Sequence, residues 1–352
     1  MIRVAVRQFR TEAIVGVTLL VATAIVLVIT GAHLHHVYDA FEHQCRAARD
    51  CANASNPVQN VDKSLQGVMP IVVLVTPALL GLFFGAPLIA RELENGTYRL
   101  AWTQSITRKR WIAVKLGLVG LFSMAVAGLL TWMVDWWAHP LLAANGDRFG
   151  LALFGIQGVA PIGYAAFALA LGVAAGVLLR HTVAAMVVTG VGFGAARLVV
   201  TYLVRPNLAS PVRKLLPLSA GSGPSIGFTN AGGGNVIFGP PQVSVPNGWV
   251  YSTTLVDKAG HAPTAQYVAH ACPVIGRAAH QLAASGGRPG AGPSGAQIQA
   301  CIAKLSTSIH TLVTYQPASR FWPFQLAEMG IFIVAALALC GCSYWWLRRR
   351  YA

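Results

Sequence analysis

Charged residues are scarce in this chain, and acidic residues are the scarcest. Only 11% of the 352 residues are charged, with 11 Asp and Glu against 26 Lys and Arg, whereas 55% are hydrophobic. A soluble domain carries about a quarter charged residues, so this composition excludes an ordinary soluble protein. The formal net charge of +15 favours contact with anionic membrane lipid. No basic face of a soluble domain is evident, so we predict no nucleic-acid partner.

Common catalytic and metal-binding motifs are also absent. The sequence contains no GxxxxGK[ST] loop and no HExxH motif, so a Walker A site and a zincin site are excluded. Histidines gather after the first apolar run, but His35 and His43 are eight residues apart. Along a helix that spacing is about 12 Å, too long for one shared ion. We therefore predict a chain that is not an enzyme and that holds no cofactor or metal.

What the chain does contain is long apolar runs. A helix of about 20 residues crosses the hydrocarbon core of a bilayer, and such helices satisfy their own backbone groups in lipid. The first run follows three arginines, but it is longer than the apolar part of a signal peptide, so we interpret it as a retained span. The sequence therefore predicts an all-α membrane protein with six spans, near residues 13–33, 68–90, 112–138, 151–179, 182–204 and 321–347.

Basic residues indicate the orientation of these spans. They are dense in the segments that are cytoplasmic if the N-terminus is inside, and sparse in the other segments. This is the positive-inside pattern. We predict a multi-pass protein of the plasma membrane with both termini cytoplasmic.

The spans divide the chain into four parts. An amphipathic helix in the plane of the membrane interface is expected in 1–12, although a plain basic flank explains the same pattern equally well. Spans one to five occupy 13–204, a small α+β extracellular domain 205–320, and span six with a cytoplasmic tail 321–352. Within the insert we expect a loop at 219–241, a strand at 249–256 and helices at 264–284 and 296–315.

The cysteines fit an extracellular insert. Cys45 and Cys51 fall in the first outer loop, whereas Cys272 and Cys301 flank a Gly/Pro-rich linker in the insert. An oxidising exterior favours the pairs Cys45 with Cys51 and Cys272 with Cys301. The alternative is that one of these pairs stays reduced.

Residues 89–115 form a charged segment between two apolar runs. The segment carries six basic residues and two acidic ones, Glu92 and Glu94. It is too long for a simple turn and too charged for the bilayer. A surface helix that contacts a cytoplasmic partner explains both properties, whereas charges that only set the topology explain the cations alone.

The order Arg91-Glu92-x-Glu94-x-Gly96-Thr97, followed by Thr107-Arg108 and Lys115, resembles the signature of type-2 ABC transporter permeases. The likeness covers about 25 residues, with Ser105 where many relatives carry proline. The run YQPASRFWPFQ at 315–325 is similar to actinobacterial members.

This resemblance implies a membrane-spanning exporter subunit. Such a subunit works as a homodimer with a cytoplasmic ABC ATPase that binds ATP and Mg, and it moves an amphipathic or apolar substrate outward. Glu92 and Glu94 are then expected to begin a short coupling helix. A membrane sensor with a ligand-binding extracellular domain is the alternative, and a membrane enzyme is the third. The ATPase-coupling residues that the resemblance implies are Arg91, Glu92, Glu94, Gly96, Thr97, Arg108 and Lys115.

Three charges lie within or at the edge of spans: Asp135, Arg197 and Glu328. An isolated charge in the bilayer is costly, so we predict an Arg197–Glu328 pair that joins spans five and six, with Asp135 as the other candidate partner of Arg197. A role in the transport path is the alternative. Two glycine pairs, Gly172-x-x-x-Gly176 and Gly190-x-x-x-Gly194, indicate close helix packing, which we expect within the chain.

Overall fold

The computed structural model describes most of the chain, in two compact units. A helical unit contains Met1–Ala209 and Arg320–Ala352, and a second unit, the sheet unit, contains Ser210–Ser319. The described residues are 2–48, 57, 61–95, 108–145, 148–150, 153–218, 225–229, 235–239, 243, 245–274, 277 and 294–350.

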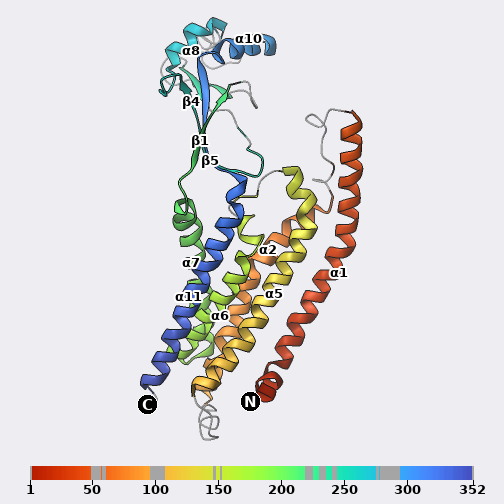
Figure 1. The fold of residues 1–352 in the computed structure, drawn as a ribbon, viewed down its shortest axis with the longest axis vertical. Coiled ribbons are helices and arrows are strands. Elements are labelled where there is room, and N and C mark those ends of the chain that lie inside the picture. Colours follow the sequence, from red (N-terminus) through yellow and green to blue (C-terminus); the bar gives the residue numbers. More distant parts are fainter. Residues whose placement is uncertain are drawn as a thin grey trace. The chain divides into compact units, whose positions relative to one another are not determined.

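Among its described residues, the helical unit contains six helices long and apolar enough to cross a membrane. Two of them include a π-helical turn. The turn η2 (Gly81–Gly85) joins α2 (Lys63–Leu80) to α3 (Ala86–Glu94) in one continuous span, and η4 (Val200–Val204) follows α7 (Thr182–Val199). The prediction of a six-span helical membrane protein with a small α+β insert is thereby confirmed. The helices, shown in Figure 1, are α1 (Ile2–Ala48), α2 (Lys63–Leu80), α3 (Ala86–Glu94), α5 (Arg108–Asn145), α6 (Ala160–Leu179), α7 (Thr182–Val199) and α11 (Phe321–Arg350).

Helix α6 lies at the centre of the helical unit. In its membrane window 72% of residues are buried, against 6% for α1. Helices α3, α5, α7 and α11 all pack against it. A helix that is apolar on every side is expected in such a position, because no face needs to meet water.

Glycines allow α6 to approach the backbone of η2 and α3. A Cβ atom on Gly172 would lie 2.5 Å from the carbonyl oxygen of Gly81, and one on Gly176 would lie 2.9 Å from that of Ala86. No side chain fits at either contact. The first predicted glycine pair therefore packs within the chain, whereas Gly194 of the second pair has no atom within 4 Å of a Cβ position.

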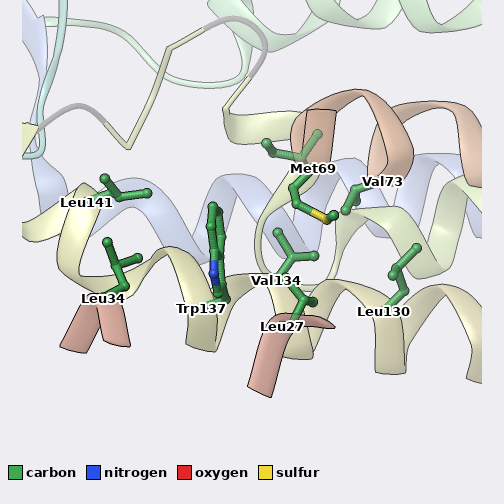
Figure 2. Close-up of a cluster of buried hydrophobic side chains, with 9 residues drawn as sticks. Leu27, Leu34, Met69, Val73, Leu130, Val134, Trp137 and Leu141 are labelled. Carbon is green, nitrogen blue, oxygen red and sulfur yellow. The ribbon is translucent and has the colours of Figure 1, made fainter. Parts of the chain in front are cut away.

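Helix α1 packs along α5 near one end of the helical unit. Figure 2 shows Leu27 and Leu34 of α1 beside Val134 and Trp137 of α5, and Met69 of α2 belongs to the same buried cluster. The indole Nε1 of Trp137 also donates a hydrogen bond to Thr30 Oγ1 at 3.1 Å. These contacts hold α1, of which only 6% of the membrane window is buried, against α5.

Two helix boundaries differ from the sequence-based expectation. Helix α1 is continuous from Ile2, so no break in the helix marks the expected boundary at residue 12. The run 151–179 is not one helix, because Phe154–Ile156 form a 3₁₀ turn (η3) and α6 begins only at Ala160. Gly158 lies between them with a φ of 66°, in the left-handed region that favours glycine.

The sheet unit is built around a three-stranded antiparallel sheet of order β1–β5–β4. One helix, α10, begins with a capping box between Ser294 and Gln297. Buried residues of strands and helices, among them Leu255, Val268 and Leu305, form one core. The elements are β1 (Val212–Pro217), β2 (Ser225–Thr229), β3 (Asn235–Gly239), β4 (Trp249–Asp257), α8 (Ala265–Ala271), α10 (Gly295–Leu305) and β5 (Ile309–Gln316).

The expected helix at 296–315 is wrong in its second half. Helix α10 ends at Leu305, and Ile309–Gln316 form β5, the central strand. Ile309, Thr311 and Val313 alternate as buried residues, which is the period-two pattern of a strand. The expected loop at 219–241 likewise contains the paired strands β2 and β3.

Candidate functional site

Two groups of polar side chains in the helical unit are candidates for function. The first, the end contacts, joins the end of α3 to the starts of α5 and α7 through Glu92 and Glu94. The second, the buried charge cluster, surrounds Glu328 on α11. Each group connects helices that are distant in sequence.

In the end contacts, Glu92 of α3 pairs with Lys115 of α5. The Oε1 atom of Glu92 accepts a hydrogen bond from Lys115 Nζ, and the side chains are only 19% and 11% exposed. A pair this sheltered is screened less by solvent and salt than a surface pair. It fixes the end of the α2–η2–α3 helix against the start of α5.

Glu94 reaches the first turn of α7. Its Oε2 atom accepts hydrogen bonds from Thr182 N at 3.2 Å and from Thr182 Oγ1 at 2.7 Å. The N-cap residue of α7, His181, provides no side-chain cap, so a carboxylate from another helix satisfies an amide that would otherwise lack a partner. Negative charge at a helix N-terminus is also electrostatically favourable.

These positions correct the expected coupling helix. Glu92 and Glu94 do not begin a helix: they lie in its last turn, because α3 continues from the second span and ends at Glu94. Asn95 closes it with a backbone hydrogen bond to Arg91 O, and glycine follows in the sequence, where helices commonly stop. Arg91 is exposed on the same turn.

The remaining residues of the signature are only partly described. Gly96 and Thr97 lie outside the described residues. Arg108 is the first residue of α5, although its side chain is also outside them. The second half of the predicted segment, from Arg108 to Lys115, is therefore the start of the third span.

The buried charge cluster has Glu328 at its centre. The carboxylate has no exposure and accepts from Arg205 Nε at 2.9 Å, from Arg205 Nη2 at 3.0 Å and from Tyr164 OH at 2.6 Å. Arg197 Nη1 donates a longer bond of 3.3 Å. The cluster connects the end of α7 with α6 and α11.

Both arginines also stack on aromatic rings. The guanidinium of Arg197 lies 3.7 Å from the ring centroid of Tyr164, and that of Arg205 lies 4.2 Å from that of Phe154. Such contacts favour arginine over lysine. Gly155 makes room for Arg197, because a Cβ there would lie 2.4 Å from Arg197 Nη2.

The predicted charge residues are thus only partly brought together. Arg197 contacts Glu328, but the two-point partner of Glu328 is Arg205, which is not among the predicted charge residues. Asp135 makes a separate contact, accepting from Gly158 N at 2.8 Å.

Arg197 and Arg205 are eight residues apart, and an unbroken α-helix would place their side chains about 80° apart around the helix axis. The extra residue of the π turn η4 removes most of this difference.

The predicted disulfide residues belong to neither candidate site. Cys272 and Cys301 form a disulfide between the end of α8 and α10 in the sheet unit. Cys45 is also disulfide-bonded, whereas Cys51 lies outside the described residues. Within the described part of the chain, no group of three or more His, Cys, Asp or Glu residues is placed to hold a metal ion.

Within the described part of the chain, six helices are long and apolar enough to cross a membrane, and one of them is largely enclosed by the others, as in a multi-pass membrane protein. A family described as "ABC-2 membrane transporter related" matches residues 17–205, more than half of the chain. The chain belongs to this family. No curated protein and no solved structure matches it.

Proposed function

We propose that the chain is the membrane-spanning subunit of an ABC exporter that moves an amphipathic or apolar substrate outward. The family membership supports a transporter permease. In this proposal a separate cytoplasmic ATPase binds ATP and Mg, and this chain has no enzymatic activity of its own. The complex contains a second copy of the chain and is surrounded by lipid.

The end contacts carry this proposal. Through Glu92 and Glu94, the end of α3 is tied to both α5 and α7. A partner that displaces the segment between α3 and α5 therefore moves the ends of three spans together. Charges that served topology alone would need no such partners.

Orientation follows the distribution of basic residues. The start of α1, the start of α5 and the end of α11 lie at the same end of the helical unit (Figure 1). These helix ends are rich in arginine and lysine. We assign this end to the cytoplasm of the plasma membrane, which places both termini inside and the sheet unit outside.

Affinity purification from native membranes tests the proposal. A tagged chain in mild detergent should retain a protein with a Walker A motif, identified by mass spectrometry, and the complex should hydrolyse ATP. Retention of a kinase or another regulator in place of an ATPase would refute the exporter and favour a sensor whose sheet unit binds a ligand.

A further inference from the structure

The buried charge cluster has more positive than negative charge. Arg197 and Arg205 supply two cations, and within the described residues their only salt bridges are to Glu328. The Arg205 side chain has no exposure, and that of Arg197 is 12% exposed. We propose that this cluster is a binding site for one anionic group, a phosphate or a carboxylate.

The hydrogen-bond donors and acceptors of the cluster also favour an anion-binding site. Glu328 Oε1 already accepts three hydrogen bonds, and Oε2 accepts one from Arg205 Nε. Arg205 Nη1 is buried and has no hydrogen-bond partner among the described residues. Leaving a buried charged donor without an acceptor is costly. An oxyanion beside the two guanidiniums supplies the missing acceptor.

The exposed part of the cluster is the side chain of Arg197, at 12%. Among the described residues, Arg197 donates one hydrogen bond, of 3.3 Å from Nη1, so Nη2 and Nε have no acceptor in this part of the chain and can donate to a ligand. Its guanidinium is held between the ring of Tyr164 and Gly155. Planar guanidinium groups fit oxyanions with two parallel hydrogen bonds, which a lysine would not provide.

The depth of the cluster suits a ligand that enters from the membrane interface. Glu328 is seven residues after the start of α11, about 10 Å along the helix axis, and Tyr164 is four residues after the start of α6. Half of the hydrocarbon core is about 15 Å thick. A lipid headgroup or a free anion near these helix ends can therefore reach Arg197.

Two probes distinguish the source of the anion. Inorganic phosphate is titrated into the purified chain in neutral detergent while the midpoint of thermal unfolding is followed. Separately, native mass spectrometry counts phosphatidylglycerol retained from mixed vesicles with phosphatidylcholine. Stabilisation by phosphate alone identifies a free anion, and retention of phosphatidylglycerol alone identifies a lipid headgroup. Either result supports the site.

Substitutions test whether the probe binds at the buried charge cluster. Arg197→Gln should weaken binding of the effective probe by about tenfold or more, since a charge-assisted contact is lost. Gly155→Ala keeps both charges but displaces Arg197 Nη2, and should weaken binding as well. Arg148→Gln is the matched control, because Arg148 stacks on Phe321 and forms no salt bridge with Glu328.

Two outcomes overturn the proposal: neither probe binds the wild type, or Arg197→Gln and Gly155→Ala bind as tightly as Arg148→Gln. Elution in size-exclusion chromatography checks that each variant is folded. The assays need no ATPase and no transport. A negative result in the binding assays would not contradict the exporter proposal. Conversely, evidence against the exporter proposal would not contradict the anion site.

Discussion

Arg205 and Glu328 form a two-point ion pair in which neither side chain is exposed, although 123 residues separate them in the sequence. Their hydrogen bonds join the end of the fifth span to the first turns of the sixth. Without Arg205, the buried carboxylate would keep, among the described residues, only the longer bond from Arg197 and the bond from Tyr164. The pair therefore links the end of the fifth span directly to α11.

We predict that Arg205 stabilises the fold through Glu328 more strongly than Arg197 does. Removing one member of a buried ion pair costs about 3–5 kcal/mol when the other charge is left unpaired. Once Arg205 is removed, the only ion pair left to Glu328 among the described residues is the 3.3 Å contact with Arg197. Arg205→Met should approach that loss, and Arg197→Met should cost clearly less. Double-mutant cycles with Glu328→Gln, read from unfolding in detergent, measure each coupling. A larger coupling for Arg197 would contradict this order.

The sequence predicts the pairing of charges only in part. Burial cost indicates that Glu328 and Arg197 need partners, but it cannot identify Arg205 at the end of a span. Arg205 precedes Pro206, and a proline usually indicates a helix boundary, where an arginine is expected to be exposed. The π turn that orients Arg205 inward has no simple sequence signal.

The spans themselves follow from the sequence, because apolar runs of this length have few alternatives in lipid. The sheet unit is harder, because short apolar runs do not distinguish helix from strand. Its β5 strand could have been found from the alternation of Ile309, Thr311 and Val313. The end of α3 was missed because the charges suggested a new helix, whereas the span extends beyond its apolar part.

Glycines on α6 give the second prediction. Gly172→Ala should destabilise the helical unit by about 1–3 kcal/mol, because the new methyl group would overlap the backbone of Gly81 and Ala86. Gly194→Ala is the matched control, since nothing lies within 4 Å of its Cβ position. It should be neutral, or stabilising by up to about 1 kcal/mol through helix propensity. Thermal unfolding of the helical signal in circular dichroism measures both, and equal effects would disprove the close contact.

The Cys272–Cys301 disulfide gives the third prediction. The bridge closes a loop with a sequence separation of 29 residues, for which loop-closure entropy predicts about 3.6 kcal/mol of stabilisation. A reductant should therefore increase proteolysis within residues 210–319 in the wild type. In Cys272→Ala/Cys301→Ala, proteolysis should be high from the start and unchanged by the reductant.

Two free cysteines serve as the control for this experiment. Cys340 and Cys342 of α11 are not disulfide-bonded, so replacing both with serine should leave the response to reductant intact. If Cys272 or Cys301 reacts with maleimide before reduction in unfolded protein, the bridge does not form.

The final prediction concerns how the end of α3 transmits movement. Glu92→Gln/Glu94→Gln removes the negative charges that face Lys115 and the N-terminus of α7, and so weakens both links, while leaving the helices intact. We expect the variant to insert and to retain the ATPase, but transport should no longer follow ATP hydrolysis. The charge-swapped variant Glu92→Lys/Lys115→Glu should recover part of the coupling, because it restores the ion pair between α3 and α5.

Glu42→Gln is the control, since Glu42 pairs with Arg46 in an exposed contact near the C-terminal end of α1. Unchanged coupling in the double variant would show that these carboxylates serve only folding or topology. Loss of the ATPase itself would instead place them in the partner's docking surface.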